Sequence, residues 1–303
     1  MIRRLKYHEI DFKKYTECLE NSAQRKYSAT RDFLDITSGK QWELLVYKDY
    51  KAVMPVPYVK KRGVKIVLNP KLCQQLGIFS EKDNPEINEL FLSYLKKNYL
   101  IRIYTFNDAN QFHSAMSVKN NFLIYPESYE KVYAKYSPKR KRKLRLDQSV
   151  MEHVGIKNIS YDDAESFIKS HILGARKEGD IVGFLRIFKD FFSAQSLHFS
   201  AFYYQEKITN LIVTYIDHQT IALLGTFNDK NFVKLSGASV LIDNAIKEHI
   251  ETRIFDFEGG SLPNIEEFFR GFRPELKPYA IIETSKTDIL KKFVPLFLKG
   301  KLF

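Results

Sequence analysis

Three strand-like runs follow one another between residues 197 and 225, and they constrain the fold more than any motif in the sequence. The runs read LHFSAFYY, KITNLIVTYI and QTIALLG, with turn residues at Gln205-Glu206 and Asp217-His218 between them. Such runs are typical of antiparallel strands joined by tight turns. Helical spacing of apolar residues predicts helices over 162–170, 181–193, 237–250 and 262–270. Further strands are expected over 155–159, 253–257 and 279–284.

The first half of the chain has a similar order of elements. Helices are expected over 11–20, 28–37, 85–97 and 108–116, and strands over 42–47, 51–57, 64–68, 101–106 and 121–125. YHEI, residues 7–10, supplies the first strand in this interpretation, and 72–79 is extended. A length of 303 residues also suits two domains. We therefore predict an α+β fold with two tandem domains, each a mixed, mostly antiparallel sheet flanked by helices.

The polar segment around residues 126–150 divides the two halves. We expect an N-terminal domain over 1–126, a basic connecting helix over 127–150 and a C-terminal domain over 151–303. Only two cysteines, Cys18 and Cys73, are present, so a disulfide framework is excluded and a reducing cytoplasm is expected. The N-terminus lacks the apolar core of a signal peptide. The seven histidines are dispersed, and no metal site is predicted.

A dense basic run gives the strongest electrostatic signal in a chain of net charge +12. Six cations fall within seven residues: Lys139, Arg140, Lys141, Arg142, Lys143 and Arg145. A second cluster, Lys60, Lys61, Arg62 and Lys65, lies in an expected hairpin turn. On a helix, six neighbouring cations repel one another at spacings of three and four. The run is either a solvated helix face or a polyanion-binding surface, for which tRNA and an anionic membrane are both suitable partners.

The element order resembles that of the GNAT acyltransferases, and two such halves in one chain resemble the FemAB-like proteins. FemAB proteins transfer amino acids from aminoacyl-tRNA onto peptidoglycan precursor peptides. The segments YSPKRKRKLRLDQSVMEHVGIKNI (136–159) and RIFDFEGGSLPNIEEFFRGFRPELKPY (253–279) carry the likeness in the second half. MPVPYVKKRG and QQLGIFS resemble segments of uncharacterised bacterial proteins of this kind. The resemblance covers most of the chain.

The resemblance implies a donor site in the second half. GNAT enzymes bind the CoA pyrophosphate at a Q/R-x-x-G-x-G/A turn, where the N–H groups of a helix N-terminus face the phosphates. Residues 234–239 occupy that place, and we expect Lys234, Ser236, Gly237, Ala238 and Ser239 to bind the donor. The alternative is an ordinary helix start with Ser236 as its N-cap. The matching first-half segment, 79–83, has no glycine and two acids, so only the second half is expected to bind phosphate.

The resemblance also implies an acyl site between the fourth and fifth strands of the domain, which splay apart. On a strand, Asp256 and Glu258 point to one face, and Phe255 and Phe257 point to the other. A carboxylate at the end of the fifth strand can accept a proton from an attacking amine. Glu258 is the expected base, and Asp256 and Tyr279 are further catalytic candidates. In the alternative interpretation, the acids pair with Arg253 or cap the next helix.

These features together predict an N-acyltransferase with no tightly bound cofactor. Its donor is acyl-CoA, such as acetyl-CoA, or aminoacyl-tRNA, and its acceptor is an amine on a cell-wall precursor or a small molecule. The amine attacks the thioester or ester directly, and positioning supplies most of the rate. The alternative function is a catalytically inactive tandem GNAT protein that binds an anionic ligand or a partner.

Overall fold

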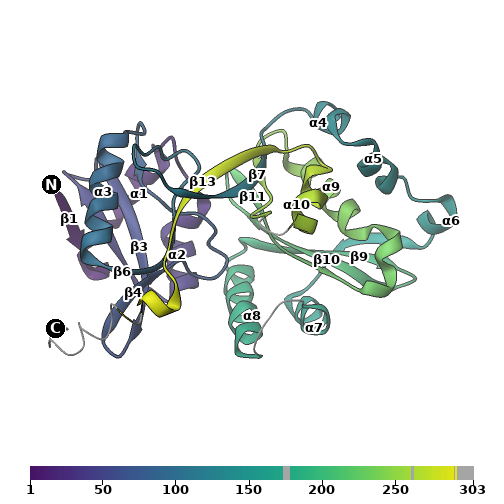
Figure 1. Cartoon of the computed structure of the whole chain (residues 1–303). Coiled ribbons are helices and arrows are strands. Elements are labelled where there is room, and N and C mark those ends of the chain that lie inside the picture. Colours follow the sequence, from purple (N-terminus) through teal and green to yellow (C-terminus); the bar gives the residue numbers. More distant parts are fainter. Residues whose placement is uncertain (173–177, 261–262, 290, 292–303) are drawn as a thin grey trace. The chain divides into compact units, whose positions relative to one another are not determined.

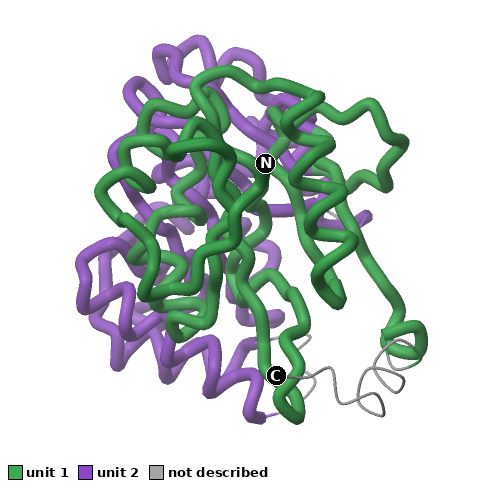
Figure 2. The backbone as a smooth tube through the Cα atoms, turned by 90° about the vertical axis from the view of Figure 1, so that its left-hand side faces the viewer, with its two compact units in different colours: residues 1–120, 278–303 green, residues 121–277 purple. Residues whose placement is uncertain are grey.

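The computed structural model describes residues 1–172, 178–260, 263–289 and 291 (Figure 1). The chain forms two compact units (Figure 2): unit 1 contains residues 1–120 and 278–303, and unit 2 contains residues 121–277. The chain passes from unit 1 into unit 2 within β7 (Ser117–Ile124) and returns within β13 (Glu275–Glu283). The compact units begin and end at other residues than the predicted domains, so they do not test the predicted boundaries at 126 and 150. These boundaries stay predictions.

Unit 1 is built on a mixed sheet in which the strands lie in the order β1-β2-β3-β4-β6-β13, with β5 beside β3. β4 and β6 are parallel and are joined through a helix, whereas β1 to β4 pair antiparallel in succession. The strands are β1 (Ile2–Leu5), β2 (Trp42–Tyr47), β3 (Ala52–Lys61), β4 (Val64–Leu68), β5 (Phe79–Ser80) and β6 (Leu100–Thr105). The helices are η1 (Tyr7–Glu9), α1 (Phe12–Glu20), η2 (Tyr27–Ala29), α2 (Arg31–Ser38) and α3 (Pro85–Asn98).

Unit 2 is built on a sheet in the order β7-β12-β11-β10-β9-β8, in which β11 and β12 are parallel and the other pairs are antiparallel. Its remaining strands are β8 (Val154–Asn158), β9 (Leu197–Tyr204), β10 (Lys207–Ile216), β11 (Thr220–Asn228) and β12 (Ile254–Asp256). Its helices are α4 (Tyr129–Lys135), α5 (Pro138–Leu144), α6 (Gln148–Met151), α7 (Tyr161–His171), α8 (Glu178–Ser193), η3 (Lys230–Leu235), α9 (Gly237–His249) and α10 (Pro263–Arg270). In Figure 1, α7 and α8 cover one face of this sheet and α9 covers the other.

An apolar core joins the sheet of unit 2 to α9. Buried residues from β7, β11, β12 and α9 form it, among them Phe122, Leu223, Ile242, Phe255 and Phe257. Phe255 and Phe257 lie on one side as predicted, with their ring centroids 4.9 Å apart. The core fixes α9 and β12 together, and so it positions the polar residues that follow β12.

The structure confirms the three successive strands of the second half as β9, β10 and β11, and the helix predicted over 237–250 as α9. Two first-half predictions are wrong. The first strand is β1 at residues 2–5, since residues 7–9 form the 3₁₀ turn η1. Residues 108–116 form no helix, because the side chains of Asn107 and Asn110 accept hydrogen bonds from backbone N–H groups nearby. One of these bonds runs from Ala109 N–H to Asn107 Oδ1 (2.8 Å). Such side-chain contacts compete with helix formation.

The connecting segment 127–150 is three short helices, α4, α5 and α6, and the prediction of one basic helix is wrong. Pro138 causes the break between α4 and α5, because steric clash with a proline ring disfavours helical dihedrals at the residue before it. Ser137 has extended dihedrals, and its side chain accepts from the N–H of Arg140 as the N-cap of α5. Its own N–H donates to the carbonyl of Gly271 (3.0 Å), which ties the start of α5 to the end of α10.

Candidate functional site

The parallel pair β11 and β12 comes apart at its carboxyl end. Pairing runs from Thr220 and Ile254 to Ala222 and Asp256, whereas β11 itself continues to Asn228. A bulge in the β10–β11 register, after the pair Thr214 and Leu223, bends β11 directly beyond the last paired residue. The splaying expected between these two strands is therefore present in unit 2.

The N-terminus of α9 lies at the same edge of the sheet as the end of β12. The helix follows β11 through η3 and leads back into β12, so its N-terminus is next to the carboxyl end of β11, on the side of the parallel pair where α/β folds bind ligands. Gly237 packs against Asn210, which pairs with Asn228. Asn228 is six residues beyond Ala222, so about 20 Å of β11 separates the helix N-terminus from the level of Asp256.

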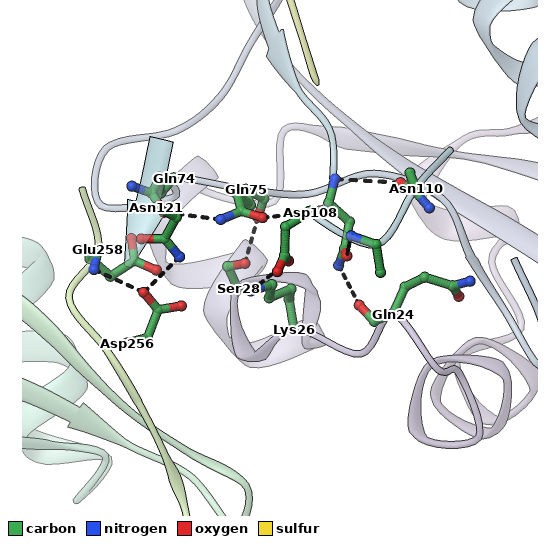
Figure 3. Close-up of polar contacts among 12 residues, drawn as sticks. Gln24, Lys26, Ser28, Gln74, Gln75, Asp108, Asn110, Asn121, Asp256 and Glu258 are labelled. Atoms are coloured by element: carbon green, nitrogen blue, oxygen red, sulfur yellow. Dashed lines mark hydrogen bonds and ion pairs between the residues drawn. The ribbon is translucent and has the colours of Figure 1, made fainter. Parts of the chain in front are cut away.

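Asp256 is buried and locks the turn after β12. Its Oδ1 accepts from the Nδ2 of Asn121 (2.9 Å) and from the backbone N–H of Glu258 (2.9 Å), as Figure 3 shows. The Oδ1 of Asn121 in turn accepts from the N–H of Gly259 (3.2 Å). Asp256 is 1% exposed and Asn121 is fully buried. These contacts make Asp256 a structural anchor for the neighbouring carboxylate of Glu258.

Glu258 lies in the left-handed region, with φ of 50°. It follows the end of β12, so the strand alternation that placed it with Asp256 ends before it, and that part of the prediction is wrong. Gly259 and Gly260 follow with φ of 143° and 130°, and a Cβ at Gly260 would overlap the ring of Phe122. A non-glycine residue in this region costs about 1–2 kcal/mol, and such strain concentrates at functional sites. The assignment of Glu258 as the catalytic base stays a prediction.

Tyr279 lies in unit 1, in β13, where it is 4% exposed, whereas Asp256 and Glu258 lie in unit 2. Its catalytic assignment stays a prediction. In the described part of the chain no group of three or more histidines, cysteines, aspartates or glutamates has an arrangement that would hold a metal ion.

The turn expected to bind the donor precedes and opens α9. Ser236 is the N-cap residue of α9, as in the alternative interpretation, but it has a left-handed φ of 57°, and within the described residues its side chain makes no capping hydrogen bond. Its carbonyl accepts from the N–H of Ser239 (2.8 Å). Lys234 is exposed at the end of η3. A Cβ at Gly237 would overlap Asn210 Oδ1 and approach Phe202 Cδ1 to 2.7 Å, so packing also requires this glycine.

The basic run of α5 divides into anchoring and exposed residues. Arg140 is 5% exposed, and its guanidinium donates through Nη1 to Ser239 Oγ and through Nη2 to the carbonyl of Phe268. Lys139 pairs with Glu267 at 3.0 Å, and Lys141 Nζ donates to the carbonyl of Ala134. Lys139 is itself exposed, as are Arg142, Lys143 and Arg145. We expected the six cations of the run to form one cationic surface. The burial of Arg140 was not predicted, because a run in which nearly every residue is charged shows no apolar face that would mark a buried position.

The second cationic cluster lies in unit 1, at the tip of the β3–β4 hairpin. Lys60, Lys61 and Arg62 are exposed, and the turn has left-handed φ values at Arg62 (47°) and Gly63 (81°). Lys65 instead contacts the buried carboxylate of Glu43, which also pairs with Arg4. Lys65 therefore has a structural role as an ion-pair partner of Glu43, and three exposed cations remain at the hairpin tip.

In unit 1 the carboxyl ends of the parallel strands β4 and β6 are filled by the chain itself. Thr105 N–H donates to Asn69 Oδ1 (3.2 Å), and its carbonyl accepts from Leu76 N–H (3.1 Å). Gln75 and Lys26 extend this network: Asp108 N–H donates to Gln75 Oε1 (2.9 Å), and Lys26 pairs with the Asp108 carboxylate at 3.0 Å (Figure 3). In unit 1, side-chain hydrogen bonds thus occupy the sheet edge that is equivalent to the one with the predicted donor turn in unit 2.

Unit 1 also contains a cleft of about 870 Å³ between α1, the β2–β3 turn and the start of α3. Lysines and acids alternate along it: Lys14, Glu17, Lys48, Asp49, Lys51, Glu81 and Lys82. Cys18 lines the cleft, and burial raises the pKa of its thiol to about 11. The thiol is therefore protonated near neutral pH, which makes Cys18 unsuited to act as a nucleophile.

No protein-family model matches this sequence, and no curated protein matches it. Solved structures do match its fold. FemX has a TM-score of 0.64 at 9% identity over 91% of this chain and 96% of its own. A tandem GNAT protein from the clavulanic acid biosynthesis pathway has a TM-score of 0.51 at 8% identity, covering 93% of this chain and 97% of its own.

L-PGS from Bacillus licheniformis has a TM-score of 0.50 at 13% identity and covers 96% of both chains. At these identities the likeness concerns the fold alone. Among the described residues, no helix has both the length and the apolar character needed to cross a bilayer. The chain has the α+β fold of the tandem GNAT-like, FemAB-like proteins.

Proposed function

We propose that this protein is an N-acyltransferase that transfers an acyl or aminoacyl group from a phosphate-bearing donor to an amine. The single observation that carries the proposal is the shared sheet edge in unit 2. There the N-terminus of α9 and the strained Glu258 after β12 follow two parallel strands that separate beyond Ala222 and Asp256. An anion site and a carboxylate at two separate levels on the carboxyl side of one splayed strand pair suit a long acyl donor and an attacking amine.

The donor phosphates bind at the start of α9 in this proposal. The N–H groups of residues 237 and 238 and the positive end of the helix dipole favour negative charge there, and Lys234 adds an exposed cation. About 20 Å along β11 then separates the phosphates from the level of Asp256, two residues before Glu258, a span that requires a long arm between phosphate and acyl carbon. The pantetheine arm of acyl-CoA supplies such a spacing.

The transfer is a direct displacement. The amine nitrogen attacks the acyl carbon, a C–N bond forms, and the C–S bond of a thioester or the C–O bond of an ester breaks. Glu258 accepts the proton that the amine loses, and the leaving thiol or hydroxyl takes up a proton. Asp256 acts through the turn that it holds, since its Oδ1 accepts from the Glu258 N–H. Proximity of the two bound substrates supplies much of the acceleration.

Ala238→Asp is expected to weaken donor binding and leave the fold intact. An aspartate in the first turn of a helix is favourable, so the melting temperature stays within a few degrees of the wild type. Its carboxylate occupies the place of the phosphate and repels it. In calorimetric titration with acetyl-CoA, we expect the Kd to rise about tenfold or more, a loss near 1.4 kcal/mol.

Ala238→Ser is the matched control for this experiment, since it adds a polar group without charge. Its Kd for acetyl-CoA should stay near that of the wild type. Equal affinity in Ala238→Asp and Ala238→Ser would remove the donor site from α9. Titration at two salt concentrations separates a shaped site, which keeps its affinity, from diffuse charge attraction.

Aminoacyl-tRNA is the second candidate donor, and the exposed cations of α5 favour it. Arg142, Lys143 and Arg145 lie together on the surface of unit 2, and neutralising them to glutamine should weaken tRNA binding at every salt concentration. The slope of log affinity against log salt should fall by about two to three, since each phosphate contact contributes about 0.9.

The control for the tRNA experiment removes the same net charge elsewhere in unit 2, at Lys157, Lys169 and Lys189. These residues are exposed on β8, α7 and α8. If both triple variants lose the same affinity, net charge and not the α5 surface drives the binding. If tRNA does not bind but anionic lipid vesicles do, the α5 cations face a membrane, and the tRNA donor is excluded.

A further inference from the structure

A buried arginine connects two regions that are far apart in the sequence. Arg140 is 5% exposed, although it lies within a run of surface cations. Its Nη1 donates to the Oγ of Ser239, in the first turn of α9, and its Nη2 donates to the carbonyl of Phe268, in α10 (2.7 Å). One side chain of α5 therefore holds α9 and α10 at the same time.

The pocket around the Arg140 guanidinium is shaped for it. The group lies over the rings of Phe268 and Phe272, with its central carbon 4.3 and 4.2 Å from their centroids. A Cβ at Gly271 would approach its Nε and Nη2 to 3.0 Å, so a larger residue there would press on the charged group. Two flanking rings and a glycine at the point of closest approach fix the orientation of the planar fork.

Burial of this charge is unfavourable in itself. It lowers the pKa of Arg140 to about 10, an effect that the Coulombic attraction of Tyr136 and Asp243 opposes. Asp243 is one helical turn beyond Ser239 on α9, and it accepts from the hydroxyl of Tyr129 (3.0 Å). A buried cation is retained where its hydrogen bonds specify one arrangement of the elements around it. Here that arrangement includes the first turn of α9.

We propose that Arg140 is a positioning residue for the donor turn, which it fixes by joining Ser239 of α9 to the carbonyl of Phe268 at the end of α10. The inference rests on the proposed function, because the positioned groups are the N–H donors of residues 237 and 238. Without the fork, the first turn of α9 frays, and its N–H groups no longer converge on one phosphate. Arg140 touches neither donor nor acceptor in this role.

Three variants test the role of Arg140. Ser239→Ala removes one hydrogen bond, Arg140→Met removes the charge and both hydrogen bonds, and Arg140→Lys keeps the charge but cannot donate to both partners in fork geometry. We expect the KM and Kd for the donor to rise about tenfold in Arg140→Met, the equivalent of one charge-assisted hydrogen bond, and less in Ser239→Ala and Arg140→Lys. The KM for the acceptor should not change.

A purely structural role would lower stability without this selectivity. Phe191→Leu is the control: Phe191 is a buried residue of α8, which packs on the opposite face of the sheet from α9, so we expect the change to lower the melting temperature without acting on the donor turn. It should leave the donor KM unchanged. Amide hydrogen exchange provides a readout that needs no donor: Ser239→Ala should speed exchange in residues 237–241, and Phe191→Leu should not.

The outcomes separate the inference from the proposed function. If the wild type binds the donor and both Arg140→Met and Ser239→Ala bind it equally well, the positioning role is overturned. The proposed function then stands. Equal increases in donor and acceptor KM, or an increase in Phe191→Leu as well, also overturn it. If the wild type binds neither acyl-CoA nor aminoacyl-tRNA, the proposed donor site is wrong, and the positioning role falls with it.

Discussion

Replacement of Glu258 with glutamine is expected to lower kcat about 10²–10⁴-fold, the usual contribution of a general base. Glutamine keeps the size and the left-handed backbone of the residue, and its N–H still donates to Asp256. Only the ability to accept a proton is lost. The donor KM should stay near the wild-type value, because the phosphates bind at the other end of β11. Steady-state kinetics with a saturating amine measure both quantities.

Glu258→Gly is the matched control for stability. Glycine takes a φ of 50° without strain, so this variant should be as stable as the wild type or more stable, and equally inactive. A stable but inactive pair of variants identifies a residue kept for function at a cost in stability. Full activity in both would remove Glu258 from the mechanism. If the wild type binds donor without turnover and both variants bind equally well, the chain is the anion-binding protein of the alternative hypothesis.

Gly237→Ala is expected to lower the free energy of unfolding by about 1–3 kcal/mol, the range for an overpacked interior. The added methyl group would overlap Asn210 Oδ1 and press on Phe202, two buried side chains that the sheet holds in place. Urea denaturation monitored by circular dichroism measures the loss. Because Asn210 also donates to Asn228 Oδ1 (2.7 Å), it cannot move away without breaking that bond.

Gly155→Ala is the control, since a Cβ at Gly155 meets no atom within 4 Å. Its free energy of unfolding should be unchanged. Equal stability of the two alanine variants would mean that α9 can shift away from β10 without cost. The comparison also matters for ligand experiments: a charged residue at Gly237 would disturb the packing and the phosphate turn together, whereas Ala238 tests the turn alone.

Periodic patterns predicted the parts of the fold that depend on burial. β9, β10 and β11 are buried aromatic and β-branched runs, and α9 has a regular apolar face, so each was found near its true bounds. The helix predicted over 108–116 is absent because the shape of this segment depends on side-chain contacts of Asn107 and Asn110, some of them with a partner distant in sequence, Asp83. No local pattern reports such partners.

The candidate site was predictable only at the level of motif. The spacing of residues 234–239 located the N-terminus of α9, and the alternation of acids and phenylalanines located the end of β12. The left-handed φ of Glu258 was not predictable, since it follows from the clamp that Asn121 forms with Asp256 and Gly259. Arg140 was equally hidden, because its partners Ser239 and Phe268 are about 100 and 128 residues away along the chain.

The return of the chain to unit 1 in β13 determines the order in which the protein can be assembled. Unit 2 is one continuous stretch, residues 121–277, whereas unit 1 needs residues on both sides of it. On the ribosome, β6 emerges long before β13, its partner. Ile103, Tyr104 and Thr105 therefore cannot pair with Ile281 to Glu283 until those residues have been synthesised. Unit 2 is complete first, and we expect it to fold before unit 1 closes during synthesis. Unit 1 closes its sheet only afterwards, so its last step is a long-range pairing across the finished domain.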